Sequence, residues 1–341
     1  MRGCAIGQPL YIHYKANVKR LQAQPGIEGE MKVKTWGICP ILQKSGEKLT
    51  NPNYNGVNTQ KYSELRLGRM EKIKRNERLG ALTRILMDTP NRIHTLSEFC
   101  ELFGAAKSTV SEDIDLVSAS LARFDLGRVE TVAGAAGGVR YRAIPSPARV
   151  RQSLDEVARR LSEPGRMLPG GFLYTSDITA EGTVAQRMGE ILASQYYDSK
   201  PHFVLTMETK GIPIALMTAR MLDVPLVIAR RDSRAYEGSA VKINYIAGGN
   251  DRIETMALTR RAVNPGQRAL IVDDFMKGGG TLQGMVDLMR EFQAEVVGVC
   301  VMIATAKPES KRVENVRSLL ILEGFDPVTG CANIHPAEEY R

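Results

Sequence analysis

The sequence predicts an α/β protein in which a small winged helix-turn-helix precedes a larger domain with a mostly parallel sheet. Two observations lead to this prediction: three short helical patterns are followed by a two-stranded hairpin, and beyond them apolar strands alternate with helices. The chain has 341 residues, of which 43% are hydrophobic and 25% charged, so it can bury two cores. We place the two domains at residues 70–145 and 146–341.

Residues 1–69 show neither a sustained helical period nor strand alternation, and turn-forming residues cluster at 51–56. We expect this segment to be a disordered leader or an upstream extension, with Met70 as the native start in the second case. Its Lys and Arg residues give it +7 of the total net charge of +8. Net charge therefore says little about the two domains, and an argument for nucleic-acid binding depends on local pattern.

Other features limit the class of protein. No stretch approaches eighteen consecutive apolar residues, and the first thirty residues lack the continuous apolar region of a signal peptide, which favours a cytoplasmic protein. The five cysteines are scattered and never at metal-ligand spacing, so we expect reduced thiols and no metal site.

Three amphipathic patterns open the first domain. The first runs from Arg78 to about Thr89, and Gly104 closes the second. Ser108 or Thr109 can cap the third helix, whose apolar face consists of Val110, Ile114, Val117 and Leu121. The period then changes to two, and strands at 129–132 and 139–143 flank a glycine-rich turn at 134–138. Three helices followed by such a hairpin are typical of a winged helix-turn-helix.

The third helix of this fold lies in the major groove of DNA, with its N-terminal residues at the base edges. Basic side chains contact phosphates there, and hydroxyl groups contact phosphates or bases. The candidates are the polar residues that start this helix, two wing arginines and the basic residues that open the domain: Lys107, Ser108, Thr109, Ser111, Arg140, Arg142, Lys72, Lys74 and Arg75. Glu112, Asp113 and Asp115 either face away from phosphate or must be compensated by base contacts.

The second domain begins with a helix at about 148–162, followed by apolar strands at 203–207, 226–229, 269–272 and 296–304. Strands that alternate with helices predict a mostly parallel sheet covered on both faces. Ligands of such sheets bind beyond the carboxyl ends of the strands.

One turn of this sheet carries the residues for a ligand. The strand at 269–272 runs into paired acids and then glycines, and Thr281 opens a helix. Glycines let backbone N–H groups approach a phosphate, the helix N-terminus adds a favourable field, and the carboxylates suit the vicinal hydroxyls of a ribose. The candidate effector-binding residues here are Asp273, Asp274, Phe275, Met276, Lys277, Gly278, Gly279, Gly280 and Thr281.

This turn resembles the phosphoribosyl pyrophosphate (PRPP) motif of the type I phosphoribosyltransferases. A second match, at 205–213, lies where that family binds pyrophosphate, and it presents Thr209, Lys210 and Gly211 as a tight loop before a helix. Lys210 supplies positive charge for a diphosphate. The resemblance implies a type I phosphoribosyltransferase-like fold for the second domain and PRPP, with or without magnesium, as its ligand.

The loop departs from the enzymes at Lys277 and Gly278, where most carry small hydroxyl residues or alanine, and at Phe275, which is bulkier than the usual aliphatic. Lys277 adds a cation beside the phosphates, and Phe275 offers a face on which a purine can stack. Neither change supplies an acid or a base. Phe172 and Tyr174 are further candidates to hold a base, although core packing explains them equally well.

Together with the wing turn, these features make the chain, over about residues 72–327, similar to the purine operon repressors of Gram-positive bacteria. That resemblance implies a homodimeric regulator of purine biosynthesis and salvage genes that binds operator DNA and does not catalyse. It also implies that PRPP weakens DNA binding and that guanosine tetraphosphate competes for the pocket. The stretch 234–260 matches the flexible catalytic loop of the enzymes, and its alternating pattern at 241–246 predicts a hairpin, either an intersubunit or a DNA-facing arm.

Two other interpretations remain. A working purine phosphoribosyltransferase with an accessory N-terminal domain would release pyrophosphate from PRPP, whereas a sensor would not. A winged-helix protein whose sheet domain only dimerises would bind no PRPP at all.

Overall fold

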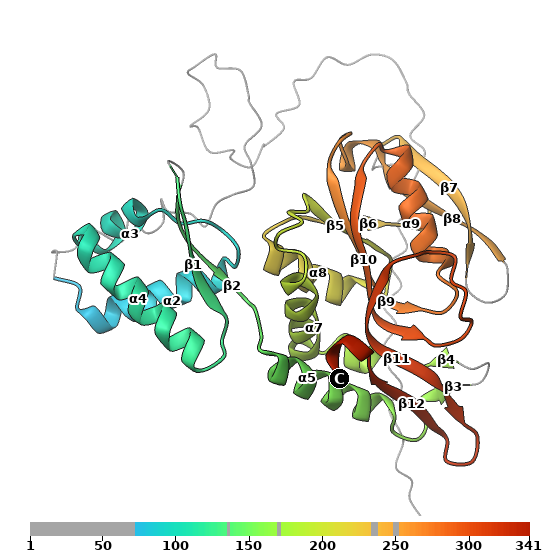
Figure 1. Ribbon diagram of the computed structural model, residues 1–341. Helices are drawn as coiled ribbons and strands as arrows, with labels where there is room; N and C mark the ends of the chain where they lie inside the picture. Colours follow the sequence, from blue (N-terminus) through green and yellow to red (C-terminus); the bar gives the residue numbers. More distant parts are fainter. Residues whose placement is uncertain (1–71, 135–136, 169–171, 233–237, 248–251) are drawn as a thin grey trace, which may run out of the picture. The chain divides into compact units, whose positions relative to one another are not determined.

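The computed structural model describes residues 72–134, 137–168, 172–232, 238–247 and 252–341 (Figure 1). The expectations for residues 1–69 and for Met70 lie outside this part of the chain. The first domain consists of three helices and a two-stranded antiparallel hairpin, which confirms the winged helix-turn-helix. Its elements are α2 (Arg75–Asp88), α3 (Leu96–Phe103), α4 (Lys107–Arg123), β1 (Arg128–Val132) and β2 (Gly138–Arg142).

Local chemistry explains where these helices begin and end. The Thr95 side chain accepts a hydrogen bond from the Glu98 amide and so caps α3. Gly104 ends α3 in the left-handed conformation, at φ 59°, which glycine adopts without strain. The prediction that Ser108 or Thr109 caps α4 is wrong, because the helix already begins at Lys107, after Ala106, with no side-chain cap.

The domain core lies between α2, α3 and α4. Leu82 and Leu86 of α2 are fully buried, and Phe99 and Phe103 of α3 stack with ring centroids 6.1 Å apart. The predicted apolar face of α4, Val110, Ile114, Val117 and Leu121, is buried as expected. The wing is tied to the turn before α3, because His94 and Val139 exchange two backbone hydrogen bonds of 2.8 Å. This packing fixes α4 relative to the wing.

The second domain contains a six-stranded sheet in the order β12-β11-β10-β9-β5-β6. All neighbouring pairs are parallel except β11 and β12, which confirms the mostly parallel sheet. The strands are β5 (Phe203–Met207), β6 (Leu226–Ala229), β9 (Arg268–Met276), β10 (Glu295–Thr305), β11 (Val316–Asp326) and β12 (Cys331–Pro336). β9 therefore lies in the middle of the sheet, between β10 and β5.

Alternation along β9 divides the interior into two cores. Leu270 and Val272 belong to the core on one face, together with side chains of α5 (Pro147–Leu161), α7 (Gly182–Ser194) and α8 (Ile212–Leu222). Ala269 and Ile271 belong to the other core, with side chains of α9 (Gly280–Glu291). Both faces of the sheet are covered, as predicted. Small elements complete the domain: β3 (Met167–Leu168), β4 (Phe172–Leu173), α6 (Ser176–Thr179) and two short 3-10 helices, Arg260–Ala262 and Glu338–Tyr340.

The hairpin predicted within 234–260 is confirmed as an antiparallel pair, β7 (Ala240–Ala247) and β8 (Arg252–Thr259), which packs beside α9 (Figure 1). Its buried residues Tyr245 and Met256 belong to the same core as α9. The strand predicted to end at Val272 continues to Met276, so the paired acids lie inside the strand rather than beyond it.

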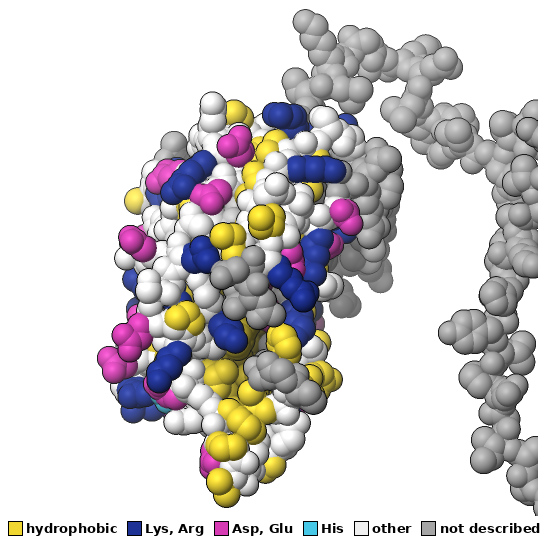
Figure 2. Space-filling view, turned by 90° about the vertical axis from the view of Figure 1, so that its right-hand side faces the viewer, with side chains coloured by type: hydrophobic (Ala, Val, Ile, Leu, Met, Phe, Trp, Pro, Cys, Tyr) yellow, Lys and Arg dark blue, Asp and Glu magenta, His cyan; other side chains and the backbone are white. Residues whose placement is uncertain are grey.

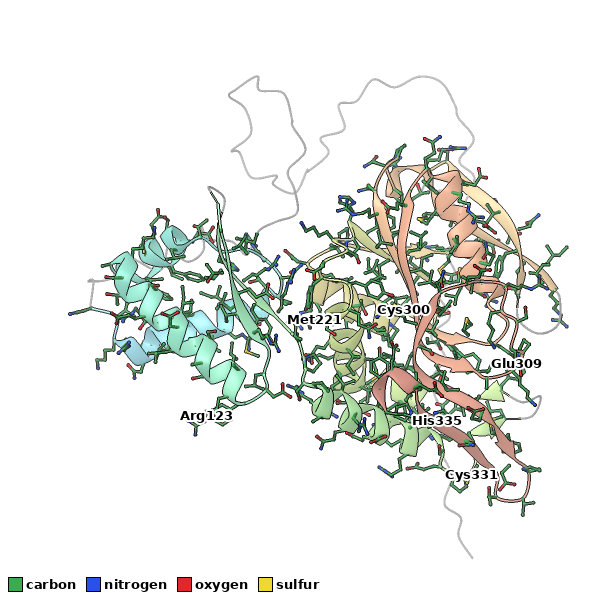
Figure 3. The ribbon with its side chains drawn as sticks, viewed as in Figure 1. Arg123, Met221, Cys300, Glu309, Cys331 and His335 are labelled. Atoms are coloured by element: carbon green, nitrogen blue, oxygen red, sulfur yellow. The ribbon has the colours of Figure 1, made fainter. Side chains whose placement is uncertain are left out.

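Three of the cysteines lie in the described part of the chain, and all three are free: Cys100, Cys300 and Cys331. Figure 3 labels Cys300 within β10 and Cys331 at the start of β12. Among the described residues no helix is long and apolar enough to cross a membrane.

Candidate functional site

Two neighbouring carboxyl groups lie at the carboxyl end of the central strand β9. Asp273 is 7% exposed and Asp274 8%, and the Asp274 amide donates a hydrogen bond of 3.0 Å to Asp273 Oδ1. Burial raises the pKa of Asp273 well above its ordinary value, and the neighbouring Asp274 raises it further. Such a pair is costly to bury, and it suits a site where ligand hydroxyl groups donate to the carboxylates.

The second predicted loop meets this pair directly. A Cβ atom on Gly211 would overlap both Asp273 Oδ1 and Thr206 Oγ1, so any larger residue there would have to displace these side chains. Burial raises the pKa of Asp274, and the positive charge of the nearby Lys210 partly opposes that rise. Thr209 and Lys210 are exposed at the end of β5. The structure thus brings the two motifs into one site, with a cation at its rim and buried acids at its base.

The glycine loop connects β9 to the N-terminus of α9, where the free amides of the first turn and the helix dipole favour an anion. Gly279 adopts φ 80°, and a Cβ atom there would overlap Val313. A Cβ atom on Gly280 would overlap the Ile246 carbonyl oxygen of β7. Two of the three glycines are therefore required by close packing on both sides of the loop, in addition to the predicted approach of a phosphate.

The other residues of the loop differ in exposure. Lys277 is exposed, and Phe275 and Thr281 are half-buried. Tyr245 of β7 lies near Thr281, and its hydroxyl donates to Glu254 Oε2 at 2.8 Å. The inclusion of Met276 among the effector-binding side chains is corrected, because it is 6% exposed and packs in the core beside α9. Its side chain supports the loop from within.

Phe172 and Tyr174 lie on and just after β4, with 68% and 43% of their surface exposed. Neither ring is a core side chain, so the core-packing interpretation of these two residues is wrong. Among the described contacts, none joins either ring to the glycine loop, and their role toward a base stays a prediction. Figure 2 shows hydrophobic side chains at the lower end of the face it views, the end where Figure 1 places β3, β4 and the β11–β12 hairpin.

On the DNA side, the first turn of α4 presents the predicted polar residues. Lys107, Ser108 and Ser111 are exposed, and Thr109 is half-buried. Lys72 and Lys74 are also exposed before and at the start of α2. These residues are accessible to a nucleic acid, as their predicted role requires.

Not all of the acids of α4 present a negative charge to DNA, because one of them, Asp113, is neutralised inside the domain. Asp113 is buried and accepts hydrogen bonds from Arg78 Nε at 2.7 Å and Arg75 Nε at 3.1 Å. Arg78 also donates to the Ile73 carbonyl oxygen. Arg75, a predicted DNA contact, is thus already engaged with Asp113, and with Glu112 at 3.6 Å. These ion pairs fasten α4 to α2.

The wing arginines behave differently from one another. Arg140 is partly exposed and pairs with Glu130 at 3.0 Å. Arg142 is only 6% exposed, and its guanidinium donates to Asn91 Oδ1 at 3.1 Å and pairs with Glu130 at 3.3 Å. The prediction that Arg142 reaches DNA is corrected: the two arginines share one face of β2, but Arg142 is buried against Asn91 and Glu130, whereas Arg140 keeps part of its surface exposed.

Comparison with known proteins places this geometry in a family. Residues 74–143 match the family model "Bacterial purine repressor, N-terminal", and residues 175–329 match "Phosphoribosyl transferase domain". The purine biosynthesis transcriptional repressor PurR of Bacillus subtilis is 39% identical over 74% of this chain and 88% of its own length. The chain belongs to the bacterial purine repressor family.

Other members of the family match as fully. The probable purine biosynthesis transcriptional regulator PurR of Streptococcus pneumoniae is 38% identical over 75% of this chain and 93% of its own. The purine biosynthesis transcriptional activator PurR of Lactococcus lactis is 39% identical over 74% and 94%. These relatives are transcription regulators rather than catalysts, and this chain is likewise a DNA-binding regulator of that family, not an enzyme.

A solved structure of adenine phosphoribosyltransferase from Thermoanaerobacter pseudethanolicus covers 49% of this chain and 98% of its own, with 20% identity and a TM-score of 0.44.

Among the described residues, no group of three or more His, Cys, Asp or Glu side chains could hold a metal ion.

Sequence reasoning about this family member missed three residues near the two sites. Arg78 donates to Asp113, Tyr245 lies near Thr281, and Lys311 donates to the backbone of the glycine loop. Each lies far along the chain from the residue it supports. No local pattern signals such a contact, although the helical period did place Arg78 at the start of the first helix.

Proposed function

We propose that this regulator binds operator DNA of purine biosynthesis and salvage genes as a cytoplasmic homodimer, and that PRPP bound at the glycine loop weakens that binding. The observation that carries the proposal is the contact of Gly211 with the buried Asp273 carboxylate. It joins the two ligand motifs into a single site at the carboxyl end of the sheet, where parallel sheets bind their ligands.

The site offers a partner for each part of PRPP. The amides of the loop 277–281 and the N-terminus of α9 receive the 5′-phosphate. Asp273 and Asp274, both buried, accept hydrogen bonds from the ribose hydroxyls. Lys210 meets the diphosphate at the exposed rim. Magnesium enters bound to the diphosphate.

The bound ligand acts through linkage. If PRPP lowers the affinity for operator DNA, DNA lowers the affinity for PRPP by the same factor. Guanosine tetraphosphate carries two diphosphates on a purine nucleoside, and it competes for the same loop with its base against the half-buried ring of Phe275. Its binding opposes the action of PRPP. The family includes both a repressor and an activator, so membership of the family does not fix the sign of regulation.

The test is operator affinity measured at one fixed salt concentration with and without PRPP and magnesium, because salt alone shifts protein–DNA affinity greatly. We expect PRPP to weaken binding at least fivefold, a typical size for coupling between two sites. Replacing Asp273 and Asp274 by Ala should abolish this response and spare DNA binding without effector. An unchanged affinity in the wild type would refute the coupling.

Turnover is measured on the same preparation. With PRPP, magnesium and each purine base, a regulator releases no pyrophosphate, whereas a working transferase does. Size-exclusion chromatography with light scattering checks the proposed dimer. If calorimetry detects no binding of PRPP, the sheet domain serves only for dimerisation.

A further inference from the structure

The segment 306–315 connects β10 to β11 and runs behind the glycine loop; Figure 3 labels Glu309 on it. The Arg312 amide donates a hydrogen bond of 2.9 Å to the Gly278 carbonyl oxygen, and Val313 packs against Gly279. The loop that faces the effector is therefore supported from its far side by a segment that sequence reasoning did not single out.

Lys311 is the centre of this support. Its ammonium group donates to the Lys277 carbonyl oxygen at 2.8 Å, to the Thr305 carbonyl oxygen at 2.8 Å and to Thr305 Oγ1 at 3.3 Å. All three acceptors are neutral, so the positive charge is not cancelled by any of these bonds. Partial burial lowers the pKa of this ammonium group, as expected for a cation held by carbonyl oxygens rather than by a carboxylate.

These bonds determine which way the loop amides point. In a trans peptide the C=O and N–H groups point in opposite directions. Because the carbonyl groups of Lys277 and Gly278 are turned back toward Lys311 and Arg312, the amides of Gly278 and Gly279 are turned forward, toward the ligand side. Among the hydrogen bonds of the described residues, neither amide has a protein acceptor. The two donors are thus available to an anion.

We propose that Lys311 is a positioning residue for anion binding: its ammonium group holds the Lys277 peptide so that the Gly278 amide faces the phosphate, and its charge adds to the field behind the loop. The inference rests on the proposed function, because the phosphate it serves is that of PRPP. Lys311 is thus a third cation of the site, beside Lys210 and Lys277. Unlike them, it acts through the backbone of the loop and does not touch the ligand.

The experiment compares Lys311→Met, which keeps the length of the side chain without the charge, with Lys311→Arg, which keeps both charge and donors. Lys307→Met is the matched control, because Lys307 is exposed on the same segment and its loss removes the same charge. Calorimetry on the full chain measures the affinity for PRPP and for ribose 5-phosphate. Thermal unfolding and operator binding without effector show whether each variant is folded.

We expect Lys311→Met to weaken the binding of both ligands about tenfold, the loss typical of a hydrogen bond to a charged group. Lys311→Arg should recover to within about threefold, and Lys307→Met should stay within about twofold of the wild type. A purely structural lysine would lower the unfolding temperature without such a selective loss of affinity. Equal affinity of Lys311→Met and Lys307→Met would overturn the inference.

Two outcomes separate this inference from the proposed function. If the wild type binds PRPP and Lys311→Met binds it as well, only the role of Lys311 is wrong. If the wild type binds neither PRPP nor ribose 5-phosphate, both proposals fail together. Asp273→Asn changes the ribose contact and leaves the hydrogen bonds of Lys311 intact. If the wild type binds PRPP, this variant should bind it more weakly, whether or not Lys311 has the proposed role.

Discussion

Gly211 lies so close to Asp273 that a Cβ atom on the glycine would overlap the carboxylate oxygen Oδ1. Thr206 Oγ1, a buried oxygen without a hydrogen-bond partner among the described residues, lies at the same point. The contact joins the end of β5 to the end of β9, so the loop after one strand closes over the acids of the other. A larger residue at position 211 would have to push the Asp273 and Thr206 side chains aside.

Replacing Gly211 by Ala should therefore abolish effector binding. The backbone at Gly211 has φ −69°, which alanine adopts freely, so the effect comes from overlap alone. We expect PRPP affinity to fall at least tenfold and the free energy of unfolding to fall by about 1–3 kcal/mol, as overpacking does. Calorimetry and thermal unfolding measure the two effects. Gly182→Ala is the control, because a Cβ atom there meets nothing within 4 Å.

Asp273→Asn should stabilise the protein while it removes effector binding. Asn keeps the oxygen that accepts the Asp274 amide and loses the buried charge. We expect the free energy of unfolding at pH 7 to rise by about 1 kcal/mol, a common gain where a site sacrifices stability for function. Thermal unfolding tests this, with the exposed Asp155→Asn as control. A lower unfolding temperature at pH 7 would contradict the electrostatic argument.

The gain in stability from Asp273→Asn depends on pH through the pKa of Asp273. The pKa of Asp273 is raised in the folded protein, so the folded state binds the proton more tightly than the unfolded state. Stability of the wild type is then lost as pH rises from the ordinary value of 3.8 through the raised pKa. The advantage of Asp273→Asn should be present at pH 7 and shrink toward pH 4.

The fold could largely be predicted from local patterns. Helical and strand periods placed every element of the winged helix, and four apolar runs placed the strands β5, β6, β9 and β10. The antiparallel strands β11 and β12 were missed, because their exposed residues near Gly324 interrupt the apolar pattern. The end of β9 was misplaced for a similar reason: charged residues suggest a loop, and here they are buried in a strand.

The site could be predicted only as far as its motifs reach. The acid pair and the glycines are adjacent in the sequence, Lys210 belongs to a second motif earlier in the chain, and the structure brings the two motifs together. The burial of Arg142 and the bond of Lys311 to the loop depend on tertiary contacts with Asn91 and Thr305. Such contacts leave no local trace, so a single sequence cannot reveal them.

Lys107→Ala should weaken binding to operator and to unrelated DNA by similar factors. The side chain is exposed at the first position of α4, where we expect it to contact a phosphate. Loss of one phosphate contact should reduce the salt slope of log affinity by about one. Salt titrations of DNA binding measure this. Arg84→Ala is the control, because Arg84 lies on α2 and pairs with Asp88 at 2.6 Å. A change confined to one base pair of the operator would instead show a base contact.

His94 should make the winged helix sensitive to acid. Its ring lies between Thr89 and Glu98, with Nε2 2.8 Å from Thr89 Oγ1 and Nδ1 3.2 Å from Glu98 Oε2. Burial lowers the pKa of His94 below 6.5, and Arg92 acts in the same direction while Glu98 opposes it. The unfolded chain therefore binds a proton more readily than the folded domain, so stability falls as pH drops below about 6.5.

Thermal unfolding of the wild type and His94→Gln at pH 7.5, 6.5 and 5.5 measures this effect. Gln keeps a donor and an acceptor for Thr89 and Glu98 but cannot be protonated in this range. The other histidines, including His202 and His335, are common to both proteins, so the difference between the two pH curves isolates His94. We expect the wild type to lose more stability than the variant between pH 7.5 and 5.5. Parallel curves would mean that the folded domain accepts the proton without cost, and that the neighbouring Glu98 carboxylate outweighs burial.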